Sequence, residues 1–272
     1  MRLSTSSVCI FVRPEPLIRQ KTMDYDIGHV LRNWPYDPDD DLIVRIVETN
    51  DGPKLQMRID MGVIQMEIDG HPTGIKLENF ESWLDYYEQQ KTEYEAGKVD
   101  DYFTLSSDDC KKLRREGVQY YYRYLSLMKL EEFQRVIRDT ERNIRLFSFV
   151  KKYASSEIDR WALDQFRPYI IMMNTRAKSS LMLKKNPVSG IEEAIGLFDK
   201  GIGNIIEFYK EYGISSEIET SVELSILKAL KSEFLRESPP TLEEELDNAI
   251  QEERFEDAAI IRDRINSKRK EE

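Results

Sequence analysis

Cysteine and histidine are scarce in this chain of 272 residues, which contains only two of each. Cys9 and Cys110 lie far apart, so neither a disulfide framework nor a cysteine-based metal site is expected, and a reducing cytoplasm is the expected location. His29 and His71 form no His-Glu-x-x-His pattern, and the sequence also lacks Gly-x-Ser-x-Gly and a phosphate-binding glycine loop. We therefore expect no catalytic residues, no metal and no cofactor.

Long apolar runs and an excess of positive charge are missing too. No run approaches the ~20 residues needed to cross a bilayer, so no membrane partner is expected. The 51 acidic residues outnumber the 40 basic ones, which gives a net charge of −11. Because such a charge repels a phosphate backbone, direct nucleic-acid binding is not expected either. Hydrophobic residues make up 40% of the chain, which is enough for a buried core.

The first 22 residues differ from the rest, because they contain four basic residues and one acidic residue in an otherwise acidic chain. Met23 opens the first segment with globular patterning, which makes it a candidate initiator. We expect residues 1–22 to be disordered or to precede the true start.

Residues 23–100 have the pattern of a small antiparallel β-meander with a covering helix. Alternating apolar and polar residues predict strands over 42–49, 54–61 and 63–68, separated by turn residues. Three strands need a helix on their apolar face for stability. The segment 78–96, which is rich in aromatic residues, is the candidate for that helix.

Residues 101–237 predict a helical scaffold of five to seven helices. A cap at 106–109 begins a long amphipathic helix, and a second helix follows from Leu130. A later pair is expected over 161–183 and 191–212. These helical hairpins within 106–213 weakly resemble tetratricopeptide units. Their Glu-Glu starts are spaced much more widely than the ~34 residues of that repeat, so regular tandem repeats are not predicted.

Four tyrosines surround Arg123 in this scaffold. At about 100° per helical residue Tyr121 and Tyr124 point together, whereas Tyr120 and Tyr122 diverge. Such an arrangement favours core packing and groove lining over a base-stacking platform. Tyr121 and Tyr124 are therefore candidate groove residues, where a peptide could bind.

The last stretch, 241–268, is the most informative part of the chain. It follows Pro239-Pro240, and Thr241 with Glu244 forms a capping-box pattern at a helix start. Apolar residues then recur at helical spacing, are interrupted by the polar run 251–254, and resume at Phe255. Two short helices folded back on each other are predicted. A unit of this length is too short to be stable without packing against something else.

This pattern, TLEEELDNAIQEERFEDAAIIRDRINSK, closely resembles the UVR domain, the UvrB/UvrC motif of bacterial excinuclease subunits. In that family the motif is an antiparallel helical hairpin that binds another such hairpin, and related copies occur in Clp-type unfoldases and in the activator of a protein arginine kinase. The resemblance implies partner contacts by Leu246, Ile250, Phe255, Ala258, Ala259, Arg262 and Ile265. The zinc-binding cysteine pairs of the kinase activator are missing here, as are the helicase motifs and nuclease residues of the excinuclease subunits.

The expected fold is thus α+β and mostly α, with a β-meander, a tetratricopeptide-like helical scaffold and a UVR-like hairpin over 241–272. The expected function is that of a non-catalytic bacterial adaptor in the cytoplasm, whose coiled-coil-like hairpin binds an excinuclease subunit or a Clp-type unfoldase. A structural homodimer formed through the hairpin is the first alternative. An enzyme of unrecognised type is the second.

Overall fold

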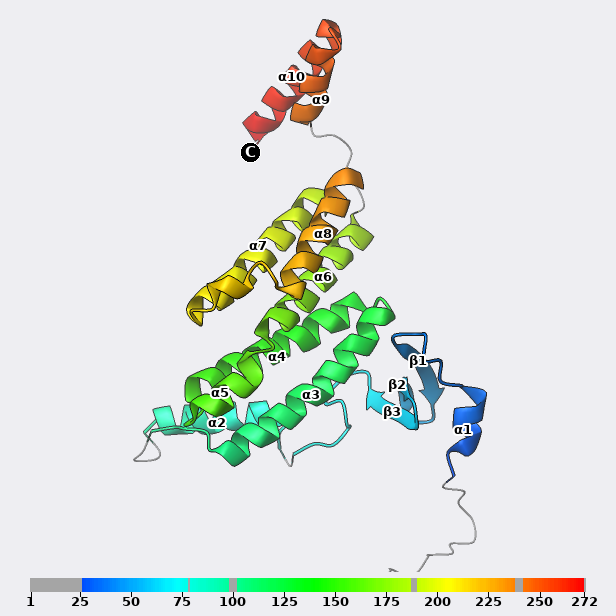
Figure 1. Ribbon diagram of the computed structural model, residues 1–272, viewed down its shortest axis with the longest axis vertical. Coiled ribbons are helices and arrows are strands. Elements are labelled where there is room, and N and C mark those ends of the chain that lie inside the picture. The colour runs from blue at the N-terminus through cyan, green and yellow to red at the C-terminus, as the bar shows by residue number, and fades with distance from the viewer. Residues whose placement is uncertain (1–25, 78, 98–101, 187–189, 238–241, 272) are drawn as a thin grey trace, which may run out of the picture.

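The computed structural model describes residues 26–271, except 78, 98–101, 187–189 and 238–241. Residues 1–22 and the predicted cap residue Thr241 lie outside the described residues. The predicted fold class is confirmed: a small antiparallel sheet near the N-terminus is followed by a body built of helices (Figure 1). The strands and helices are, in order, α1 (Gly28–Asn33), β1 (Ile43–Thr49), β2 (Gly52–Ile59), β3 (Gly62–Glu67), α2 (Trp83–Glu95), α3 (Ser107–Lys129), α4 (Phe133–Tyr153), α5 (Glu157–Asp164), α6 (Arg167–Lys185), α7 (Gly190–Glu211), the 3-10 helix η1 (Ser215–Glu217), α8 (Val222–Glu237), α9 (Leu242–Gln251) and α10 (Phe255–Glu271).

The sheet has the strand order β1-β2-β3, with both pairs antiparallel as the alternation predicts. Gly52 begins β2 with a φ of 99°, a conformation that glycine adopts without a steric penalty. Leu55 and Met57 of β2 are buried, and β2 packs against α3. The sheet therefore joins the helical body through its central strand.

The helix expected to cover the sheet, α2, instead packs on α3, and Figure 1 shows it at the other end of α3 from the strands. The cause is Glu116 of α3, which is buried. The backbone N–H groups of Trp83 and Leu84 donate to its carboxylate at 2.6 and 3.3 Å. A carboxylate is stabilised at a helix N-terminus, where the first N–H groups lack partners within the helix. This contact fixes the start of α2 on α3.

The chain that follows β3 is tied to the helices by two arginines. Arg123 of α3 donates from Nη1 to the carbonyl oxygen of Gly70 at 2.7 Å, and Arg138 of α4 donates from Nη2 to that of Ile68 at 2.8 Å. Carbonyl groups beyond the end of a strand have no partner in the sheet, and burying them unpaired is unfavourable. The two arginines supply the missing hydrogen bonds. Sheet and helices therefore form a connected structure.

In the helical body, α3 and α4 pack together, α4 packs on α6, and α7 packs on both α6 and α8. The single helix expected over 161–183 is wrong, because α5 ends at Asp164 and α6 begins at Arg167. Pro168 lies in the first turn of α6, where its missing N–H costs nothing. A helix continuing from α5 would need that N–H to bond the carbonyl of Asp164 four residues earlier, and the proline ring would clash with that carbonyl. The chain therefore breaks between α5 and α6.

The last two helices form the predicted hairpin. In the turn between them Glu253 has a φ of 58°, and the N–H of Arg254 donates to the carbonyl of Ala249 at 2.7 Å. α9 and α10 pack on each other, and Figure 1 shows them beyond the end of α8, apart from the helical body.

Among the described residues, none of these helices has the length and apolar character that a membrane span requires.

Candidate functional site

The interior of the hairpin is made of small and branched apolar side chains. Ala249 of α9 is fully buried, and Ala258 and Ile265 of α10 are nearly so. Alanine lets two helices approach closely, and the seven-residue step from Ala258 to Ile265 keeps both on one face of α10. Of the predicted partner-binding residues, Ala258 and Ile265 are thus used inside the hairpin, and Leu246 is partly buried.

The other predicted partner-binding residues are exposed. Phe255 is 66% exposed and Ile250 is 49% exposed, and Ala259 and Arg262 are exposed as well. Phe255, Ala259 and Arg262 follow one another at steps of four and three residues, so they lie along one face of α10. We call these three residues the hairpin stripe. Ile260, which the sequence reasoning did not single out, is 55% exposed on another face of the same helix.

Charged side chains flank the stripe. The Arg254 guanidinium lies 2.8 Å from Glu252 and 2.8 Å from Asp257, close to the hairpin turn. Arg262, the charged member of the predicted partner-binding set, lies 3.2 Å from the carboxylate of Asp263, and both side chains are largely exposed. Exposed ion pairs of this kind contribute little to stability. Arg262 is therefore available to a partner at small cost.

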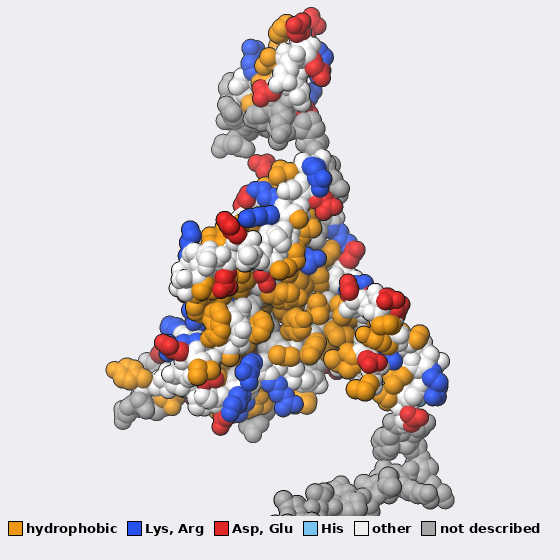
Figure 2. Space-filling model, viewed as in Figure 1, with side chains coloured by type: hydrophobic (Ala, Val, Ile, Leu, Met, Phe, Trp, Pro, Cys, Tyr) orange, Lys and Arg blue, Asp and Glu red, His pale blue; other side chains and the backbone are white. Residues whose placement is uncertain are grey.

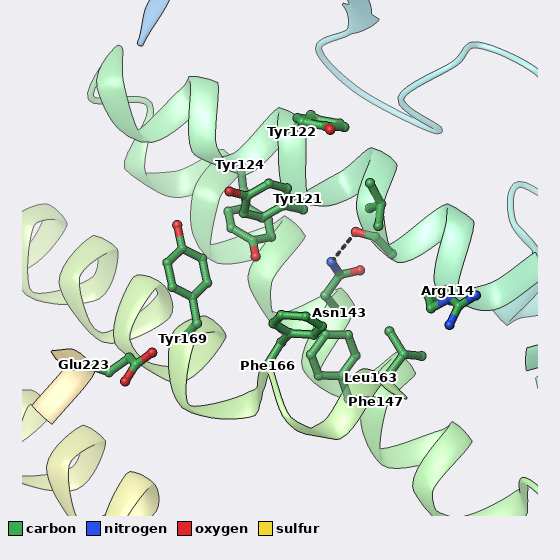
Figure 3. A pocket seen from close by; sticks show the side chains of 12 residues that line it. Arg114, Tyr121, Tyr122, Tyr124, Asn143, Phe147, Leu163, Phe166, Tyr169 and Glu223 are labelled. Atoms are coloured by element: carbon green, nitrogen blue, oxygen red, sulfur yellow. Dashed lines mark hydrogen bonds between the residues drawn. The ribbon is translucent and has the colours of Figure 1, made fainter. Parts of the chain in front are cut away.

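A second surface lies in the helical body, where a pocket of about 560 Å³ opens between α3, α4, α6 and the start of α8. Half of its lining residues are aromatic, and both candidate groove residues contribute (Figure 3). The lining residues are Arg114, Gly117, Val118, Tyr121, Tyr122, Tyr124, Asn143, Phe147, Leu163, Phe166, Tyr169 and Glu223. We call it the tyrosine pocket.

The rings of the tyrosine pocket are packed against one another. Tyr121 meets Tyr124 edge-on with ring centroids 5.6 Å apart, and Tyr169 of α6 lies 6.0 Å from Tyr121. Burial raises the pKa of Tyr169 to about 12 and also raises that of Tyr124, so both hydroxyls keep their protons at neutral pH. Tyr120 points away from the pocket and meets His71 edge-on at 5.7 Å. The divergence predicted for Tyr120 is therefore seen in the structure.

Charged residues stand at opposite ends of the tyrosine pocket, Arg114 at one end and Glu223 at the other (Figure 3). Ser221 Oγ donates to Glu223 Oε2 at 3.0 Å. On the pocket wall, Asn143 Nδ2 donates to the carbonyl of Gly117 at 2.9 Å and so links α4 to α3. The sequence reasoning missed Phe166, Tyr169 and Glu223, because they come from parts of the chain that only the fold brings to Tyr121.

A cluster of buried ionisable groups lies on the other side of α3. The Glu116 carboxylate accepts from Arg142 as well as from the two α2 amides, and His71 Nε2 lies 3.5 Å from it. Burial, followed by the charge of Arg142, lowers the pKa of His71 to about 4, so this ring is neutral at pH 7. His71 therefore contacts Glu116 as a neutral group, and the cluster serves to hold α2 and the sheet on the helices. No group of three metal-ligating side chains is found in the described ranges.

Comparison with known proteins supports the C-terminal resemblance. A family model described as the UvrB/uvrC motif matches residues 240–271, which contain α9 and α10, and confirms the motif predicted from the sequence. No curated protein and no solved structure matches the chain. The tetratricopeptide-like character of the body stays a prediction. The match indicates an interaction module at the C-terminus.

Proposed function

We propose that this protein is a non-catalytic bacterial adaptor of the cytoplasm, which binds another protein through its α9–α10 hairpin. The observation that supports this proposal best is the exposure of Phe255, a large aromatic side chain at the start of α10 that is 66% accessible to solvent. Aromatic and arginine side chains are enriched among the residues that dominate binding energies. The hairpin stripe offers one of each, Phe255 and Arg262, seven residues apart on one helix face.

The packing of the hairpin supports the same proposal. Among its described residues, Ala249, Ala258 and Ile265 are the buried side chains, and two of these three are small, so little apolar area is buried. A two-helix unit of this size needs further burial to become stable, and the exposed Phe255 and Ile250 provide the surface for it. We propose a second UVR-like hairpin as the matching surface, carried by an excinuclease subunit or a Clp-type unfoldase.

The experiment compares the full chain with its Phe255→Asp variant. Both would be tagged and purified from native extract, and retained proteins would be identified and then tested as purified partners by titration. A buried, unpaired carboxylate costs several kcal/mol, so we expect the variant to bind the partner at least about 100-fold more weakly. Ile158→Asp is the matched control, because Ile158 is 81% exposed on α5 and lies outside the hairpin. Equal binding by the full chain and the Phe255→Asp variant would contradict the proposal.

A homodimer formed by two hairpins is the second candidate. The same stripe favours it, since an exposed apolar face can pair with its own copy about a two-fold axis. Light scattering over a range of concentrations distinguishes the two. A mass that doubles with concentration and returns to that of one chain in Phe255→Asp would support the homodimer, whereas a constant monomer mass would support the adaptor.

A further inference from the structure

We propose that the tyrosine pocket is a second binding site, separate from the hairpin, for a peptide segment of a partner protein in which an apolar side chain lies next to a lysine or arginine. The apolar side chain would occupy the aromatic interior, and the basic side chain would meet Glu223. This site is independent of the function proposed for α9–α10, because none of its lining residues belongs to the hairpin.

The size and lining of the pocket fit such a segment. Its volume of about 560 Å³ lies within the range of ligand-binding clefts, which are typically apolar with a few polar groups. Apolar residues continue from the pocket onto the surface, because Val118 and Phe166 on its rim are 43% and 54% exposed and Val222, beside Glu223, is 65% exposed. Figure 2 shows apolar side chains gathered over the middle of the helical body on the face drawn. An open apolar surface of this kind suits a chain segment lying across it.

The charges at the two ends indicate which segment would bind. In the part of the chain that the structure describes, neither Glu223 nor Arg114 forms an ion pair. Burial is the main cause of the raised pKa of Tyr169. The charge of Glu223 raises that pKa further and the charge of Arg176 lowers it, so Glu223 and Arg176 both act on the aromatic wall. Ring faces and a carboxylate together attract ammonium and guanidinium groups. At the opposite end, the Arg114 guanidinium can donate hydrogen bonds to carbonyl or carboxylate oxygens of the segment.

The walls are held in place before any ligand binds. Tyr124 is only 3% exposed, and its ring is packed against Tyr121. The Asn143 amide, which is also buried, fixes the adjacent turn of α3 through its hydrogen bond to Gly117. A preformed site loses less conformational entropy on binding than one that must order its side chains. Phe166 and Tyr122 are the more exposed rings at the rim, where small adjustments cost least.

The test is a selection of random linear peptides displayed on phage against the purified full chain, followed by anisotropy titration of the enriched peptides after synthesis. We expect the enriched sequences to share an apolar residue within two positions of a lysine or arginine. Glu223→Gln keeps the shape of the side chain and removes its charge, so it should weaken binding at least tenfold. Phe166→Ala should weaken binding to a similar extent. Glu219→Gln, an exposed site on the loop before α8, is the charge-matched control and should bind as the unchanged chain does.

Two further measurements make the outcome decisive. Replacing the basic residue of the peptide by norleucine should weaken binding to the unchanged chain but not to Glu223→Gln, which shows that the two groups interact. The Phe255→Asp variant should bind the peptide normally, so that failure of the hairpin proposal and failure of this one are distinguishable. The proposal is overturned if no peptide is enriched, if the enriched peptides lack a basic residue, or if folded Glu223→Gln and Phe166→Ala bind as tightly as the unchanged chain.

Discussion

The guanidinium of Arg123 and the carboxylate of Asp139 meet between α3 and α4 through two hydrogen bonds, of 2.7 Å from Nε and 2.8 Å from Nη2, and both side chains are 1% exposed. Nη1 of Arg123 donates to the carbonyl of Glu67, the last residue of β3, and to that of Gly70 beyond it. One buried ion pair therefore links both long helices to the sheet. The geometry is the planar, two-bond arrangement in which arginine binds a carboxylate most strongly.

Asp139→Asn is expected to destabilise the fold by about 3 to 5 kcal/mol, because it leaves the Arg123 charge buried without its counter-charge. Urea unfolding at neutral pH would measure the loss. Asp263→Asn is the matched control, since its pair with Arg262 is exposed, and a change within about 0.5 kcal/mol is expected there. Similar losses at both positions would show that the buried pair has no special role.

Glu116→Gln is expected to release α2 from α3. The carboxylate accepts from the Trp83 and Leu84 amides and from Arg142, and the neutral amide that replaces it is a weaker acceptor for all three. Hydrogen exchange should therefore quicken in the first turn of α2 well before it does in α6. Uniform exchange across the helices would contradict a local role for Glu116.

His71 should make the fold acid-sensitive between pH 6.5 and about 4. Burial lowers its pKa from 6.5 to about 4 in the folded chain, so in this window the unfolded state binds more protons than the folded one. The free energy of unfolding therefore falls as the pH falls, by about 2 kcal/mol in all, and the loss is absent above pH 6.5.

Urea unfolding at a series of pH values would measure this dependence. Because carboxylates also titrate in the lower part of the window, the informative quantity is the difference between the chain and His71→Gln. That difference should shrink steadily from pH 6.5 to 4. His29→Gln is the control, because His29 is exposed and its replacement should leave the profile unchanged. Parallel profiles for the chain and His71→Gln would refute the assignment.

Local patterns in the sequence predicted the hairpin and the strands well. The hairpin can be recognised from neighbouring residues alone, through the alanines and the polar turn of 241–268. The same holds for the strand alternation that places Leu55 and Met57 on the buried face. The break between α5 and α6 was missed, although Pro168 is a local signal for it. The position of α2 was not, because it depends on Glu116, which lies 33 residues away in sequence from the amide it accepts from.

The candidate surfaces show the same contrast between residues that local spacing predicts and residues that only the fold brings in. Helical spacing was enough to group Tyr121 with Tyr124 and Phe255 with Ala259, because each pair lies on one helix. Glu223 belongs to a helix about one hundred residues later, and no local pattern distinguishes it from the other acidic residues of the chain. Its place beside Tyr169 results from the packing of α6 with α8.

Two helical glycines should respond in opposite ways to alanine, which tests the packing of α3 on α4 and α5 and that of α7 on α6. A Cβ added at Gly117 would meet Leu146 at 3.7 Å and Leu163 at 3.9 Å, which are ordinary contacts. Since alanine is the better helix former, Gly117→Ala should stabilise the fold by about 0.5 to 1 kcal/mol.

A Cβ at Gly201 would lie 2.8 Å from Cγ2 of the buried Thr175, whose branched side chain has little freedom to move. Gly201→Ala should therefore destabilise the fold by about 1 to 3 kcal/mol, as overpacked cores do. Urea unfolding of both variants against the unchanged chain measures the two effects, and shifts of the same sign would show that α3 and α7 do not pack as described.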